Sequence, residues 1–174
     1  MKTPAPKKQA VIDQKPFEIL FEKYTASHQN QANKILTWFS VPVMIFALIG
    51  LAWSIPFPHL GFLGQYNGYI NWASLVIAFS IYFYIKISPI LSYIMLLVEF
   101  IFSFFVIQVH GILKQGGMFL GSLCLALIIL VLLIQFIGQR IEGKPYSLAN
   151  VAKFQFYGPI WLLSLILKKF SIKF

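Results

Sequence analysis

The chain contains four apolar stretches, each near the roughly 20 residues that a tilted helix needs to cross the hydrocarbon core of a bilayer. They cover residues 35–55, 70–85, 90–109 and 118–138. Of the 174 residues, 59% are hydrophobic and only 11% are charged, and a water-soluble protein of this size could not bury so much apolar surface. The sequence therefore predicts an all-α integral membrane bundle of four transmembrane helices.

Two further segments are predicted to be helical without crossing the membrane. The segment PFEILFEKY, which begins at Pro16, alternates apolar and charged side chains at helical spacing, as an amphipathic interfacial helix does. The last apolar stretch is interrupted by Gly158 and Pro159, and its crossing would carry three lysines through the bilayer. This length and charge predict an interfacial or re-entrant helix over about residues 159–170. Residues 1–15 are predicted to form a disordered basic tail, and residues 16–174 a single membrane domain.

The net charge of +9 is unevenly distributed. Lysines precede the first stretch, Lys86 marks the turn between the second and third, and six basic residues follow the fourth. The loop after the first stretch has no charge, and Lys114 stands alone in the loop after the third. The positive-inside rule then predicts cytoplasmic N- and C-termini. A lysine-rich chain in which no organelle signal is recognised is expected in a bacterial inner membrane. Basic residues beside apolar spans favour anionic lipid, rather than nucleic acid, as a partner.

A few polar or reactive residues fall within the apolar stretches. Glu99 lies in the middle of the third, where an ionised carboxylate is costly, so it should face the bundle interior and be protonated or paired. A functional role and an interhelical hydrogen bond are equally favoured for Glu99, whereas Gln108 and Gln135 are predicted to form interhelical hydrogen bonds. These groups are too few to favour a transporter. The single cysteine, Cys124, excludes an internal disulfide and is predicted to be a small packing residue.

Polar residues gather in two segments that the predicted topology brings to the same cytoplasmic surface. The first precedes the first span and contains His28, Gln29, Asn30, Gln31 and Asn33. The second follows the fourth span and contains Gln139, Arg140 and Glu142. The two segments are about 100 residues apart in the sequence, and their meeting is predicted to form the functional site. His59 and His110 fall on the opposite side of the membrane.

The segments SHQNQANKILTWFSVP (27–42) and QFIGQRIEGKP (135–145), followed by FYGPIWLL (156–163), resemble the membrane family of metal-dependent 2-hydroxy fatty acid dioxygenases. The resemblance runs from about residue 17 to residue 170. The first motif is matched by Tyr24, His28, Asn30, Asn33, Val41 and Pro42, and Thr37 occupies the place of a second histidine. The second is matched by Gln135, Phe136, Gly138, Glu142, Lys144 and Pro145, and Gln139 occupies the place of its histidine.

The resemblance implies an iron(II) site that oxidises a 2-hydroxy fatty acid to an acid one carbon shorter. The metal ligands would be His28 and Glu142, and these two residues with Arg140 would form the catalytic group. The substrate would be bound by Asn30, Asn33, Gln139 and Arg140, and the structural residues would be Pro42, Gly138, Pro145, Gly158 and Pro159. Threonine and glutamine are much weaker iron ligands than histidine. The alternative hypothesis is therefore a non-catalytic membrane scaffold that binds a lipid or a partner.

Overall fold

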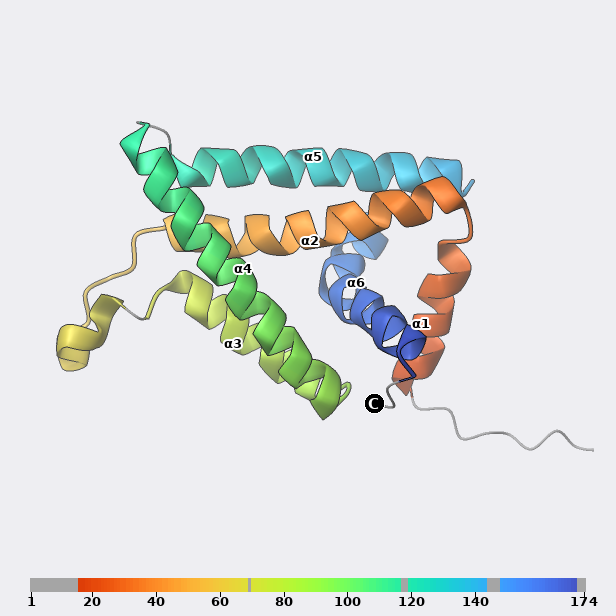
Figure 1. Ribbon diagram of the computed structural model, residues 1–174, viewed down its shortest axis with the longest axis horizontal. Coiled ribbons are helices and arrows are strands. Elements are labelled where there is room, and N and C mark those ends of the chain that lie inside the picture. Colours follow the sequence, from red (N-terminus) through yellow and green to blue (C-terminus); the bar gives the residue numbers. More distant parts are fainter. Residues whose placement is uncertain (1–15, 69, 117–118, 144–147, 172–174) are drawn as a thin grey trace, which may run out of the picture.

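The computed structural model describes residues 16–68, 70–116, 119–143 and 148–171. They form α1 (Pro16–Ser27), α2 (Gln31–Ser54), η1 (Gly61–Gly68), α3 (Trp72–Ile85), α4 (Pro89–Gln115), α5 (Leu120–Ile141) and α6 (Leu148–Lys169) (Figure 1). There is no β-strand among the described residues. The predicted all-α class is confirmed.

Three helices, α2, α4 and α5, are long and apolar enough to cross a membrane. At about 1.5 Å per residue they measure about 36, 40 and 33 Å, and the hydrocarbon core is about 30 Å thick. Residues 70–85 do not form a span by themselves, because α3 has only 14 residues and measures about 21 Å. It reaches the length of a span only together with η1, and this pair of helices is bent by 94°. The chain thus has three candidate spans, or four if η1 and α3 form one broken span.

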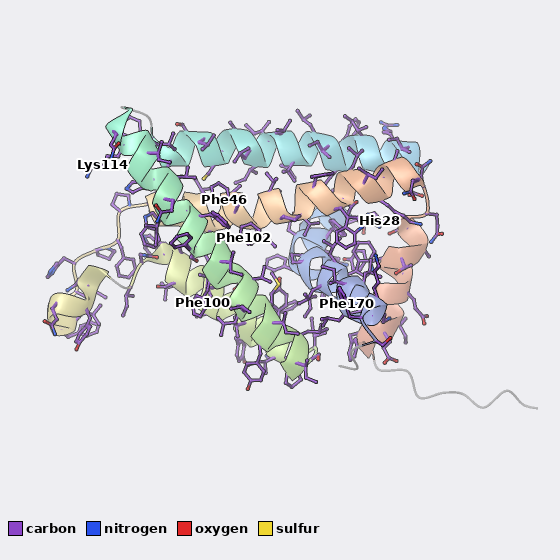
Figure 2. The ribbon with its side chains drawn as sticks, in the orientation of Figure 1. His28, Phe46, Phe100, Phe102, Lys114 and Phe170 are labelled. Carbon is purple, nitrogen blue, oxygen red and sulfur yellow. The ribbon has the colours of Figure 1, made fainter. Side chains whose placement is uncertain are left out.

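Large apolar side chains cover the outward faces of α3, α4 and α5. Phe79 is 61% exposed, Phe100 is 57% exposed and Leu133 is 56% exposed, and Figure 2 shows Phe100 on the surface of α4. A continuous apolar surface of this kind is rare on a soluble monomer. The fold is therefore compatible with a membrane protein whose α3, α4 and α5 contact lipid.

The antiparallel helices α2 and α5 lie side by side along their length (Figure 1). Small residues permit this close approach: a Cβ atom on Gly50 would lie 2.5 Å from Sγ of Cys124, and one on Gly121 would lie 2.8 Å from Oγ of Ser54. Cys124 is fully buried, which confirms its predicted packing role. Small residues at helix contacts are typical of membrane bundles.

The helices α3 and α4 form a hairpin, and Ser88 caps the start of α4. Glu99 of α4 is 5% exposed and accepts hydrogen bonds from Oγ of Ser80 on α3, at 2.7 Å to Oε1 and 2.9 Å to Oε2. As predicted, Glu99 faces the bundle interior and is paired there. Its hydrogen bonds join the two helices of the hairpin.

The helices α1 and α6 pack around the end at which α2 begins and α5 ends, which we call the polar end (Figure 1). The predicted start of the last helix at Pro159 is wrong, because α6 begins at Leu148 and continues through Gly158 and Pro159. Proline removes one helical hydrogen bond, but the following turns are buried: Ile160 is 0% exposed and Trp161 is 3% exposed. This tertiary packing offsets the lost hydrogen bond. α2 likewise continues through Pro42.

Candidate functional site

The polar segment between α1 and α2 ties the beginning of α2 to the end of α5. Asn30 is the N-cap of α2, and its Oδ1 accepts a hydrogen bond from the backbone N–H of Ala32 at 2.9 Å. The backbone N–H of Asn30 and Nδ2 of Asn33 donate to Oε1 of Glu142, at 2.9 and 3.0 Å. Gly138 leaves room for Asn33, because a Cβ atom at Gly138 would collide with Oδ1 of that buried side chain. We call Asn30, Asn33, Gly138 and Glu142 the clasp.

The clasp brings together the two segments that the sequence predicts to meet. Glu142 is the C-cap residue of α5, yet its carboxylate binds N–H groups at the beginning of α2. The partial positive charge of a helix N-terminus favours an anion there, and a charge-assisted hydrogen bond is stronger than a neutral one. Four of the predicted site and structural residues therefore join two helices.

The ring of His28 is held between α1 and α6. Its Nδ1 lies 2.9 Å from the carbonyl oxygen of Tyr24 and 3.1 Å from Oγ of Ser27. Because a carbonyl oxygen can only accept, Nδ1 carries a proton in this arrangement. The ring stacks on Phe154, with centroids 5.3 Å apart and planes at 22°, and packs against Trp161 at 5.0 Å.

Aromatic residues anchor α1 to α6 around His28. The ring of Tyr24 packs against Phe154 at 5.4 Å and Trp161 at 6.2 Å. Burial, and secondarily the neighbouring Tyr157, raise the pKa of Tyr24 to about 12, so its hydroxyl stays protonated at neutral pH. A Cβ atom on Gly158 would lie 3.1 Å from the ring of Phe154. Glycine at this position therefore lets the ring lie close to the backbone of α6.

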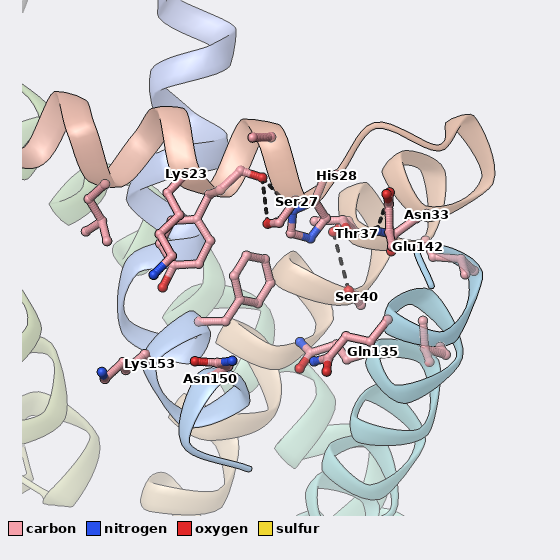
Figure 3. A pocket seen from close by; sticks show the side chains of 17 residues that line it. Lys23, Ser27, His28, Asn33, Thr37, Ser40, Gln135, Glu142, Asn150 and Lys153 are labelled. Carbon is pink, nitrogen blue, oxygen red and sulfur yellow. Dashed lines mark hydrogen bonds between the residues drawn. The ribbon is translucent and has the colours of Figure 1, made fainter. Parts of the chain in front are cut away.

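A cavity of about 410 Å³ opens between α1, α2, α5 and α6 at the polar end (Figure 3). The four positions that the resemblance assigns to a metal all line it: His28, Thr37, Gln139 and Glu142. The remaining lining residues are Leu20, Lys23, Tyr24, Ala26, Ser27, Asn33, Leu36, Ser40, Ile134, Gln135, Asn150, Lys153 and Phe154. Segments from both ends of the sequence thus enclose one space.

The lining is amphipathic, and its charges are separated. Lys23 of α1 and Lys153 of α6 lie on the side opposite Glu142 (Figure 3). Among the described residues that line the cavity, Glu142 carries the only carboxylate, and its Oε1 is bound in the clasp. The middle of the cavity combines apolar side chains with Thr37 and Ser40. An anion with an apolar tail matches this distribution.

Arg140 does not line the cavity, so the prediction that it binds a carboxylate there is not supported by its position. Its side chain is exposed, and the guanidinium lies over the ring of Phe136, 5.1 Å from the centroid. Gln135, Gln139 and Glu142 follow the helical spacing of one face, and at about 100° per residue Arg140 is displaced by about 100° from Gln139. The cavity takes its positive charge from Lys23 and Lys153 instead.

The two lysines were missed by sequence reasoning. Lys23 belongs to the charged side of an amphipathic pattern, which predicts contact with solvent. Leu20, Lys23 and Ser27 nevertheless follow one helical face, and all three line the cavity. This spacing is the only signal in the sequence that relates Lys23 to the site. Lys153 lies before the predicted start of the last helix at residue 159, and it reaches the cavity because α6 begins at Leu148.

Other predicted residues have different places in the structure. Gln135 accepts a hydrogen bond from Nε2 of Gln155 at 2.7 Å, which confirms its predicted interhelical role, whereas Gln108 is exposed. His110 lies one turn before Lys114 on α4, and Lys114 is at the far end of the molecule from His28 (Figure 2). Pro145, predicted to be structural, lies outside the described residues.

The donor set of the cavity does not fit the iron centre that the resemblance implies. A typical non-haem iron(II) site uses two histidines and one carboxylate, whereas the described part of the lining supplies one histidine, His28, and one carboxylate, Glu142. Across the described ranges, no group of three or more His, Cys, Asp and Glu residues could hold a metal ion. Glu142 Oε1 already accepts two N–H hydrogen bonds.

Comparisons of the chain with protein-family models, with curated proteins and with solved structures found no match.

Proposed function

We propose that the protein is a membrane protein that binds a single-chain anionic amphiphile, such as a fatty acid, in the cavity at the polar end, without metal chemistry. One observation carries this proposal. Two lysines from separate helices line one side of a space of about 410 Å³, and the one carboxylate among its described lining residues, that of Glu142, is engaged in the clasp. The lysines would bind the anionic group, and the apolar part of the lining would contact the chain.

The chemistry of the lining supports an amphiphile over a small polar anion. Leu20, Leu36, Ile134 and Phe154 contribute apolar surface to the same space as the lysines. Each methylene group that leaves water for such a surface contributes about 0.8 kcal/mol. Exposed lysines contribute about 0.2–1 kcal/mol each to an ion pair. Most of the affinity would therefore come from the chain, and the lysines would select the charged head group.

The proposed orientation places the polar end at the cytoplasmic face, with η1 and α3 as a broken fourth span and α1 and α6 at the interface. Basic residues of the described chain support it, because Lys23, Lys34, Arg140 and Lys153 belong to the polar end and Lys114 lies at the opposite end. In intact cells, a membrane-impermeant maleimide should label the variant Lys114→Cys and should label Lys23→Cys only after lysis. The opposite pattern would reverse the orientation.

The binding proposal is tested with the purified full chain in detergent micelles, by titration with a straight-chain fatty acid and with its methyl ester. The double variant Lys23→Ala/Lys153→Ala should raise the Kd of the acid about twofold to thirtyfold and leave the Kd of the ester unchanged. Lys86→Ala/Lys114→Ala removes the same charge outside the cavity and should change neither. The proposal fails if wild type binds neither compound, or if both double variants weaken the acid equally.

A second candidate function is the iron-dependent oxidation of a 2-hydroxy fatty acid. The observation that favours it is that His28, Thr37, Gln139 and Glu142 all line one cavity. Because two of these are not histidine, the binding module is the better supported proposal. Purified protein that contains about one iron per chain and shortens a 2-hydroxy fatty acid by one carbon would favour the oxidation.

A further inference from the structure

A second cavity, of about 250 Å³, lies on the other side of His28. Its lining is mostly apolar and comes from α1, α2, α6 and the short connection between α1 and α2: Thr25, His28, Lys34, Thr37, Trp38, Trp161, Leu162 and Leu165. His28 and Thr37 line both cavities. The two spaces are therefore adjacent at the side chains of these two residues, which we call the wall.

The ring of His28 forms one part of this wall. Phe154 lines the first cavity and Trp161 lines the second, and the imidazole packs against both, at 5.3 and 5.0 Å between centroids. Its Nδ1 is held by the carbonyl oxygen of Tyr24 and by Oγ of Ser27. Thr37, which is 5% exposed, forms the part contributed by α2. The ring contacts and the hydrogen bonds at Nδ1 therefore hold the imidazole in place between Phe154 and Trp161.

We infer that His28 and Thr37 determine the length of the chain that the protein accepts, because they close the first cavity against the second. This inference rests on the proposed function. The second cavity is suited to the apolar end of a longer chain, since two tryptophans and two leucines line it and the one lysine, Lys34, can place its aliphatic stem along the wall. Removal of the imidazole would join the two spaces.

The test measures the chain lengths that the purified full chain binds from an equimolar mixture of saturated fatty acids, by native mass spectrometry in one detergent. Wild type should show a length above which binding no longer improves. His28→Ala should move this limit to longer chains, with about a fourfold gain in affinity for each further methylene that enters the second cavity. His59→Ala, which removes an imidazole that lines neither cavity, should leave the limit unchanged.

Two more variants make the test specific for the wall. Thr37→Ala opens the wall from α2 and should also move the limit to longer chains. This variant keeps the test available if His28→Ala does not fold. Leu165→Trp fills the second cavity, so the double variant His28→Ala/Leu165→Trp should return the limit toward that of wild type. If wild type binds no fatty acid at any length, the proposed function itself is overturned. If it binds and the openings of the wall leave the limit unchanged, this inference alone is overturned.

Discussion

The two ends of the α2–α5 pair are built differently although the same two helices form both. At the end that carries Ser54 and Gly121, the helices meet through small side chains, with Gly50 against Cys124. At the polar end, Asn30 and Asn33 hydrogen-bond to Glu142. Small side chains let the helices approach closely at the first end, whereas at the second a polar contact, with α1 and α6 packed around it, lies beside a cavity. We therefore expect the clasp to determine the position of the site.

The largest effect on stability is expected from Gly138→Ala, which would disrupt the clasp at the polar end. A Cβ atom there collides with Oδ1 of Asn33, so the amide must leave Glu142. Overpacking and the loss of a partly buried, charge-assisted hydrogen bond together should lower the free energy of unfolding by about 2–4 kcal/mol. Thermal unfolding in micelles should show this lower stability. Titration with a fatty acid should show that binding is lost. A variant that unfolds as wild type does would show that the clasp is dispensable.

A metal site introduced at the polar end would distinguish this end further from the other. Its expected effect on the free energy of unfolding is similar to or smaller than that of Gly138→Ala. In Thr37→His/Gln139→His, the cavity would offer three imidazoles and Glu142, so cobalt(II) or iron(II) should bind at about one ion per chain. Metal at about 100 times its Kd should raise the free energy of unfolding by about 2.7 kcal/mol. Metal analysis and thermal unfolding measure the two quantities.

Thr37→His alone is the control for this gain, because it supplies one new imidazole instead of two and should bind metal more weakly. If the double variant holds no more metal than wild type, the four positions are not within coordination distance of a common ion. That result would show that the cavity does not have the geometry of a metal site, and it would leave the lipid-binding proposal unaffected.

The smallest effect is expected from Gly50→Ala, the counterpart of Gly138→Ala at the opposite end. The new Cβ meets Sγ of Cys124, which can turn about its χ1 angle, so the cost should be about 1 kcal/mol or less. Fatty acid binding should be unchanged, because neither residue lines a cavity. An effect on binding as large as that of Gly138→Ala would remove the distinction between the two ends.

Much of the site could be predicted from two short motifs. The polar residues beside the first and last spans were expected on one surface, and His28, Asn33, Gln139 and Glu142 do line one cavity. Arg140 is expected in the site because a guanidinium binds a carboxylate bidentately, but helical periodicity carries its side chain away from the cavity face. Lys23 and Lys153 were missed because an exposed lysine on an amphipathic helix has no local feature that distinguishes a ligand contact from solvation.

Hydropathy by itself determined the helical class and the long apolar helices α2, α4 and α5, because burial of twenty consecutive apolar residues is a local property of the chain. Only the tertiary structure decided the course of α6 through Pro159, the docking of α1 on its aromatic residues, and the wall of His28 and Thr37 between two cavities. These features depend on contacts between residues more than a hundred positions apart, such as Thr25 with Trp161. Local propensity carries no information about such contacts, since they form only when the helices pack.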